Sequence, residues 1–134
     1  MKKEALKDYI YRTSEEIDEK KIDKVLDGEK IADERRKNFN ASKFFGFFKQ
    51  IKLGYEMLKD YRSKKYTEIP WKTIALITAA LLYFLNPMDF IPDFMGFIGF
   101  TDDAIVLSVV FNSLRKDLIK YCSWKGYNVE EYFA

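Results

Sequence analysis

The stretch TIALITAALLYFL, residues 73–85, contains no charged side chain, and this run limits the possible folds more than any other feature of the chain. Pro70 precedes it, in a position suited to the first turn of a helix, and Asn86-Pro87 stops helical periodicity after it. The pattern therefore predicts a helix over about residues 70–85 that is apolar on every side. Such a helix has to be surrounded on every side, either by protein or by lipid.

A second apolar segment, AIVLSVVF, opens another predicted helix over about residues 102–125. Thr101 is its expected N-cap, Gly126 is its expected end, and residues 127–134 then form a short tail. The two helices and the turn between them predict an apolar hairpin. The charge-free part of the first helix spans about 20 Å, which is short of the roughly 30 Å hydrocarbon core of a bilayer. Periodicity alone thus leaves both a protein core and membrane insertion open.

A basic amphipathic helix is predicted over residues 42–62, before the hairpin. Residues 41–66 carry seven basic and only two acidic side chains. Aromatic and aliphatic residues recur there at spacings of three and four, and the lysines fall largely on the other side. This pattern is typical of a helix that packs on protein or lies on an anionic membrane surface. On the second interpretation, the residues in contact with the membrane are Phe44, Phe48, Ile51, Lys49, Lys52 and Trp71.

The first 40 residues differ in composition, with 11 basic and 11 acidic side chains. A charged helix is predicted from Ser14, as its N-cap, to Gly28, followed by a second short helix or a connector. We therefore divide the chain into a polar helical extension, residues 1–40, and a helical domain, residues 41–134. The expected fold is an all-α helical bundle built on the apolar hairpin. The N-terminal residues lack the apolar run of a secretory signal, so we expect synthesis without export of this part.

The composition argues against most enzyme classes. The chain has no histidine and one cysteine, Cys122, so it lacks the commonest general base and the commonest transition-metal ligand. Neither Ser108 nor Cys122 has a histidine to activate it as a nucleophile. The glycines form no phosphate-binding pattern, and the lysines of residues 43–65 lack the signature of a nucleic-acid-binding fold. We therefore expect no catalytic activity, no organic cofactor and no nucleic-acid partner.

Four aspartates, Asp89, Asp93, Asp102 and Asp103, lie in an otherwise apolar stretch. An unpaired buried carboxylate costs several kcal/mol, so each requires a partner or a position at water. Asp102 and Asp103 suit the first turn of the second hairpin helix, and Asp89 and Asp93 suit turns that follow prolines. If the four approach one another, their oxygens are suited to Mg²⁺ or Ca²⁺. Capping, pairing with Arg35, Arg36 or Arg115, and metal binding all remain open.

The stretch ALLYFLNPMDFIPDFMGFIGFTDDAIVL, residues 80–107, resembles the signature of the YkvA-like family, a domain of unknown function. That pattern is an apolar helix, P-x-D-x-I-P-D, a glycine, and a paired D-D before a second apolar helix. Its places are occupied here by Pro87, Asp89, Ile91, Pro92, Asp93, Gly99, Asp102 and Asp103. The resemblance covers about residues 70–120. It implies a small, mostly bacterial helical domain that is often predicted to be embedded in membranes, and it implies no activity.

These observations together predict a non-catalytic, membrane-associated helical domain. In this hypothesis the hairpin of residues 70–114 is inserted in lipid, and the basic helix lies at the cytoplasmic face, because basic residues flank the hairpin on both sides. The alternative is a soluble, cytoplasmic helical bundle that acts as an interaction or scaffold module with a protein partner. A third, weaker hypothesis is a divalent-cation-dependent enzyme that uses the four aspartates.

Overall fold

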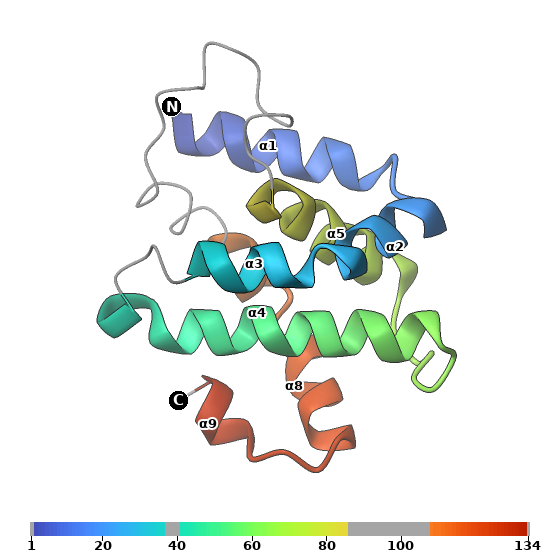
Figure 1. Cartoon of the computed structure of the whole chain (residues 1–134), viewed down its shortest axis with the longest axis vertical. Helices are drawn as coiled ribbons and strands as arrows, with labels where there is room; N and C mark the ends of the chain where they lie inside the picture. Colours follow the sequence, from blue (N-terminus) through green and yellow to red (C-terminus); the bar gives the residue numbers. More distant parts are fainter. Residues whose placement is uncertain (1, 37–40, 86–107, 134) are drawn as a thin grey trace.

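The structure, a computed structural model, is all-α. It describes the backbone of residues 2–36, 41–85 and 108–133 and the side chains of residues 7–34, 49–85 and 108–133. No strand occurs in these ranges, so the predicted all-α class is confirmed. Residues 108–113 are helical. The labelled helices (Figure 1) are α1 (Lys2–Ser14), α2 (Glu19–Asp27), α3 (Glu29–Arg36), α4 (Ala41–Arg62), α5 (Trp71–Leu85), α8 (Arg115–Trp124) and α9 (Val129–Phe133).

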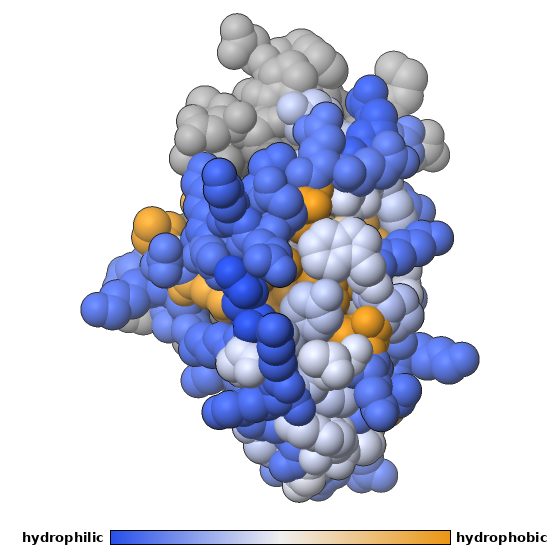
Figure 2. Space-filling view, turned by 90° about the vertical axis from the view of Figure 1, so that its right-hand side faces the viewer, coloured by the Kyte–Doolittle hydropathy of each residue, from blue (hydrophilic) through white to orange (hydrophobic). Residues whose placement is uncertain are grey.

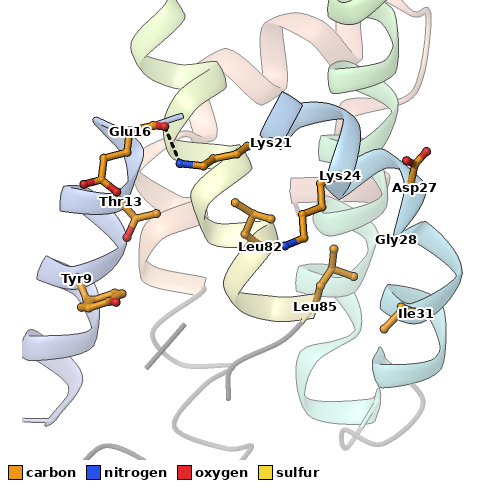
Figure 3. A pocket seen from close by; sticks show the side chains of 10 residues that line it. All are labelled: Tyr9, Thr13, Glu16, Lys21, Lys24, Asp27, Gly28, Ile31, Leu82 and Leu85. Atoms are coloured by element: carbon orange, nitrogen blue, oxygen red, sulfur yellow. Dashed lines mark hydrogen bonds between the residues drawn. The ribbon is translucent and has the colours of Figure 1, made fainter. Parts of the chain in front are cut away.

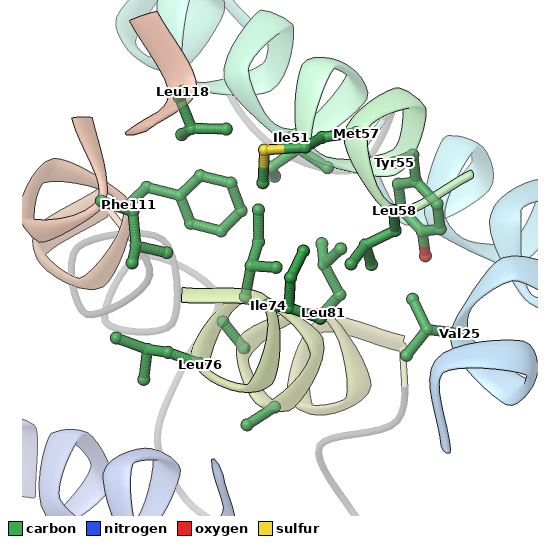
Figure 4. Packing of buried hydrophobic residues seen from close by; sticks show 14 of the residues in the cluster. Val25, Ile51, Tyr55, Met57, Leu58, Ile74, Leu76, Leu81, Phe111 and Leu118 are labelled. Carbon is green, nitrogen blue, oxygen red and sulfur yellow. The ribbon is translucent and has the colours of Figure 1, made fainter. Parts of the chain in front are cut away.

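Helix α5 is the central element of the bundle. It contacts α1, α2, α3 and α4, and in Figure 1 it lies between α1 and α4. Ile74 and Leu81 of α5 belong to the same buried cluster as Met57 of α4 and Phe111 (Figure 4). The charge-free sequence of residues 73–85 is explained by this position, because the part of a helix that other helices surround has little surface left for charged side chains. Thr78 of α5 is fully buried and donates its hydroxyl to the carbonyl oxygen of Ile74 at 2.7 Å.

The N-terminal residues pack on this central helix. Ile10 of α1, and Ile22 and Val25 of α2, are fully buried and belong to the same core cluster as α5. The predicted helix start at Ser14 is wrong, because Ser14 is the last residue of α1. Asp18 caps α2 instead, and its carboxylate accepts the backbone N–H of Lys21 at 3.0 Å. Ile10, Ile22 and Val25 are thus part of the bundle's interior.

The sequence predicted one continuous helix over about residues 102–125, but its described part, from residue 108 onwards, is interrupted. A turn at Leu114 separates helical residues 108–113 from α8. This turn lets both Phe111 and Leu118 bury their side chains in the same core. Gly126 follows the end of α8 with φ +80°, as predicted for a helix-terminating glycine. The last residues are not an unattached tail, because α9 packs on α4 and Phe133 is buried.

Candidate membrane-contact surface

The apolar stripe of α4 faces the protein interior wherever its side chains are described. Ile51 is 4% exposed and packs in the core (Figure 4), as do Tyr55 and Leu58 further along the helix. Lys52 is exposed and Lys49 is half-buried. The side chains of Phe44 and Phe48 lie outside the described residues. Ile51 therefore contacts protein in this structure, while the prediction of membrane contact by α4 stays a prediction.

The four aspartates of the predicted metal site, Asp89, Asp93, Asp102 and Asp103, lie outside the described residues. Within residues 2–36, 41–85 and 108–133, no group of three or more acidic or cysteine side chains is arranged to hold a metal ion. In the same ranges, the helices are too short or too polar to cross a bilayer. Arg115, one of the predicted partners of the aspartates, donates to the carbonyl oxygen of Phe133 at 3.0 Å.

Trp71, which the sequence named as a membrane contact, lies at the surface beside Tyr61, and its contact with a membrane stays a prediction. Its indole is 45% exposed and its ring centroid lies 6.4 Å from that of Tyr61. Trp124, at the end of α8, is 51% exposed and lies 4.8 Å from the ring of Tyr66. We call Tyr61, Tyr66, Trp71 and Trp124 the aromatic end of the bundle. It contains both tryptophans of the chain.

The connection between α4 and α5 positions the aromatic end. Helix α4 closes with Lys64 in the left-handed region, at φ 66°. The N–H of Lys64 donates to Tyr61 O at 3.1 Å and that of Lys65 donates to Asp60 O at 2.8 Å, which is the Schellman pattern. The chain then turns back, and Tyr66 is buried against Tyr121 of α8, with 5.1 Å between ring centroids. Pro70 starts the first turn of α5 and brings Trp71 to the surface.

The elements that carry these rings also carry five exposed lysines: Lys64 and Lys65 after α4, Lys72 at the start of α5, and Lys116 and Lys120 in α8. None of the five forms a salt bridge within the described part of the chain. Lys116, Lys120 and Trp124 follow one another at spacings of four, so they lie along one face of α8. The hydroxyl of Thr73 donates to Asp117 at 2.5 Å and holds this part of α8 beside the first turn of α5. Figure 2 faces the side of the molecule on which α4 ends and the chain turns back to α5, and it shows pale and orange residues bordered by hydrophilic ones there.

A polar network lies behind the aromatic end. The carboxylate of Asp60 accepts hydrogen bonds from the Tyr121 hydroxyl at 2.5 Å and pairs with the Lys125 ammonium at 3.3 Å. Burial alone would raise the pKa of Asp60, but the bonds from Tyr121 and Lys125 outweigh it, so this pKa is lowered. The Tyr127 hydroxyl donates to Glu56 at 2.8 Å. These contacts join α4 to the C-terminal part of the chain, and they give the carboxylates of Asp60 and Glu56 hydrogen-bond partners.

A second candidate site is a cavity of about 560 Å³ where α1, α2 and α5 meet. Figure 3 shows Leu82 and Leu85 on its α5 side and the ammonium of Lys24 directed towards them. Lys21 donates to the carbonyl oxygen of Glu16 at 2.9 Å. Its residues are Tyr9, Thr13, Glu16, Lys21, Lys24, Asp27, Gly28, Ile31, Leu82 and Leu85. Two lysines balance two carboxylates here, so the cavity has no net preference for a ligand of one charge.

The fold and this surface define a small all-α domain with an apolar central helix and an aromatic, basic end. Residues 73–109, which include most of α5, match the family described as "Protein of unknown function (DUF1232)". The chain is 41% identical over 71 residues to "Uncharacterized membrane protein YkvA" of Bacillus subtilis (strain 168), and the match covers 53% of this chain and 67% of that protein. No solved structure matches the chain significantly. The protein belongs to the YkvA-like family of unknown function, as the motif in the sequence indicated.

The sequence named Trp71 as a membrane contact, which stays a prediction, and did not single out Trp124 or Tyr66. The spacing of four between Lys116, Lys120 and Trp124 was a usable signal, because it is the same amphipathic pattern that singled out the helix of residues 42–62. Tyr66 had no such signal, since its position depends on the turn at Lys64 and on contact with α8.

Proposed function

We propose that this protein is a non-catalytic helical domain that associates with the cytoplasmic face of a membrane. The observation that carries the proposal is the exposure of six basic residues that flank the apolar helices in sequence. Such cations are attracted to the anionic lipids of a cytoplasmic leaflet. The related Bacillus subtilis protein is named as a membrane protein, which supports association with a membrane. The six residues are Lys64, Lys65, Lys72, Arg115, Lys116 and Lys120.

The burial of α5 favours association as a folded bundle. Insertion of the hairpin of residues 70–114 would require α5 to leave its contacts with α1, α2, α3 and α4. The apolar faces of those helices, which include Ile10, Ile22 and Leu58, would then lose their cover. Burying the apolar surface of one such side chain contributes about 1.5–3 kcal/mol, so several of them oppose insertion together. In our proposal α5 therefore stays inside the protein, with the basic residues facing the lipid headgroups.

The second candidate function is an interaction or scaffold module in the cytoplasm. The position of α5 inside the protein also supports this candidate, because a bundle with a covered central helix needs no lipid to bury it. A divalent-cation-dependent enzyme is not favoured by any contact among the described residues. For that third hypothesis, the test is metal-dependent phosphoester hydrolysis that disappears in Asp93→Asn.

Membrane fractionation separates these candidates. The untagged protein, expressed at an ordinary level, is fractionated, and the membranes are then washed with high salt or with alkaline carbonate. A surface-bound bundle sediments with membranes and is released by both washes, because its binding is mainly electrostatic. An inserted hairpin stays in the pellet after both washes. Recovery in the soluble fraction before any wash would exclude the proposal and favour the scaffold module.

A further inference from the structure

We propose that the aromatic end is the lipid-binding surface, and that it binds a bilayer rich in anionic lipids. Trp71 and Trp124 would enter the headgroup region, and Lys64, Lys65, Lys72, Lys116 and Lys120 would face the lipid phosphates. This inference rests on the proposed function and gives it a site and a lipid class. It also moves the contact away from the apolar face of α4, whose Ile51 is buried in protein.

Three contacts make the aromatic end a single surface although its residues come from distant parts of the chain. Trp71 of α5 lies beside Tyr61 of α4, with ring centroids 6.4 Å apart. Trp124 of α8 lies 4.8 Å from Tyr66. The bond from Thr73 to Asp117, at 2.5 Å, ties α5 to α8 between them. The two indoles and the five lysines are thus carried by elements that these contacts join.

The chemistry of this surface suits a membrane interface. An indole is apolar over most of its area and carries one N–H donor, and for this reason tryptophan collects at the headgroup level of bilayers. Trp71 and Trp124 are each about half exposed, so each has apolar area left to bury. Lysine adds a long apolar stem and a terminal charge that reaches the lipid phosphates. Lys72 follows Trp71 in the chain and Lys120 lies one helical turn before Trp124, a mixture of rings and cations that suits an anionic interface.

The charges on this surface are unbalanced. Five lysines share this surface with two carboxylates, Glu68 in the connection between α4 and α5 and Asp117 of α8, which leaves a net charge of 5 − 2 = +3. Asp60 does not lower this sum, because it pairs with Lys125. Asp117 counts in full, since the Thr73 hydroxyl that donates to it is neutral. The whole chain carries only +2, so the positive charge is concentrated here. An anionic surface is therefore complementary to this end of the bundle.

Nucleic acid would also present phosphates, but the arrangement of the rings favours lipid. Proteins that bind single strands stack successive bases on neighbouring exposed aromatic rings. Tyr66, which lies against Trp124, is only 4% exposed and offers no free ring face of that kind. The two exposed indoles come from different helices, α5 and α8. Shallow entry of each indole into headgroups needs no stacking platform.

Intrinsic fluorescence tests the inference directly, because both tryptophans of the chain belong to this surface. The full-length protein is mixed with vesicles of phosphatidylglycerol and phosphatidylcholine, or of phosphatidylcholine alone. We expect a blue shift of the emission, and quenching by brominated acyl chains, with the anionic vesicles only. A shift that occurs with a single-stranded oligonucleotide and not with vesicles would overturn the inference in favour of nucleic acid.

Matched substitutions identify the surface. Lys72→Gln with Lys120→Gln removes two charges from the aromatic end, and Lys20→Gln with Lys30→Gln removes two exposed charges from α2 and α3. Each lysine near an anionic surface contributes enough that the first pair should weaken vesicle sedimentation by about tenfold or more. The second pair should weaken vesicle sedimentation far less.

Substitution of an exposed apolar side chain gives a second matched pair. Trp124→Ser should weaken binding to the vesicles, and Ile31→Ser, at an exposed apolar residue of α3, should not.

The outcomes separate this inference from the proposed function. If the unsubstituted protein sediments with anionic vesicles but both lysine pairs weaken binding equally, membrane association stands and the aromatic end is not its site. If the unsubstituted protein binds no vesicles and no membranes, the proposed function fails, and this inference fails with it. Circular dichroism of each variant establishes that it is folded. Should Trp124→Ser not fold, the lysine pairs, which change only exposed side chains, give the answer.

Discussion

The phenolic oxygen of Tyr55 is buried and has no hydrogen-bond partner among the described residues. The residue is 1% exposed, and burial, with further contributions from Glu29 and Asp33, raises the pKa of its hydroxyl. A buried polar group without a partner loses its hydration and gains nothing in return. We predict that Tyr55→Phe increases the free energy of unfolding by about 1 kcal/mol, measured by urea denaturation.

Tyr121→Phe is the matched control for this prediction. The hydroxyl of Tyr121 donates to Asp60 at 2.5 Å, so the same loss of an oxygen here removes a hydrogen bond to a carboxylate. It should lower the free energy of unfolding by about 1.5–3 kcal/mol. A Tyr55→Phe protein that is less stable than the unsubstituted one would show that the Tyr55 hydroxyl has a partner in solution.

Lys64 has a backbone conformation that favours glycine. Its φ of 66° lies in the left-handed region, which costs a residue with a side chain about 1–2 kcal/mol. Glycine avoids this cost but loses about 0.5–1 kcal/mol through the freedom of the unfolded chain. Lys64→Gly should therefore increase the free energy of unfolding by about 0.5–1 kcal/mol.

Gly126 provides the reverse experiment at the same position of another helix end. Its φ is +80°, and a Cβ there would meet no atom within 4 Å, so Gly126→Ala changes only the backbone preference. It should lower stability by about 1 kcal/mol. If Lys64→Gly also lowers the urea midpoint, the side chain of Lys64 makes a stabilising contact that outweighs its backbone strain.

At the scale of helices, the crossing of α4 over α5 depends on Gly54. A Cβ at this position would lie 2.7 Å from Cδ1 of Ile77, which is buried in α5, and 3.5 Å from Cε2 of Phe111. We predict that Gly54→Val lowers the free energy of unfolding by about 2–3 kcal/mol through overpacking. Lys52→Val, at an exposed site on the same helix, controls for the lower helix propensity of valine. Adding Ile77→Ala to Gly54→Val should recover part of the loss, and equal effects of the two valine variants would contradict the prediction.

The sequence predicted the elements whose signals are local. Pro70 and Asn86 bounded α5, Gly28 ended α2, and the spacing of apolar residues located α4. It did not predict α1, the turn at Leu114 or the packing of α9, because these depend on the distant surfaces that they cover. The same limit applies to the candidate surface. Periodicity places Ile51 on the apolar face of α4, but only tertiary packing decides that its side chain lies in the protein core.

The whole molecule should lose stability at alkaline pH. The hydrogen bond to Glu56 and partial burial raise the pKa of Tyr127 to about 12, and burial raises the pKa of Tyr66, Tyr121 and Tyr132 as well. In the unfolded chain these hydroxyls lose their protons near pH 10. Because the folded state holds these protons more tightly, the stabilisation is complete below about pH 10 and is lost as the pH rises towards 12. Urea denaturation across this range should show it.

Tyr127→Phe tests the assignment of this effect. The variant lacks the titrating hydroxyl, so its stability should fall less steeply between about pH 10 and 12 than that of the unsubstituted protein. At neutral pH it should be slightly less stable, because the bond to Glu56 is gone. Identical slopes for the two proteins would mean that other groups dominate the alkaline transition.

The single cysteine reports whether the bundle stays closed, in solution and on a membrane. Cys122 is fully buried in the core cluster that includes α5, and burial raises the pKa of its thiol. Alkylation therefore requires opening of the structure. We predict that the thiol of the native protein reacts only through global unfolding, so the free energy from labelling rates should equal that from urea. Phe133→Ala, which loosens α9, tests whether a local opening suffices.

Labelling of Cys122 in the presence of anionic vesicles then decides how the protein meets lipid. A surface-bound bundle keeps Cys122 protected, whereas insertion of α5 takes apart the core around it and would make the thiol reactive.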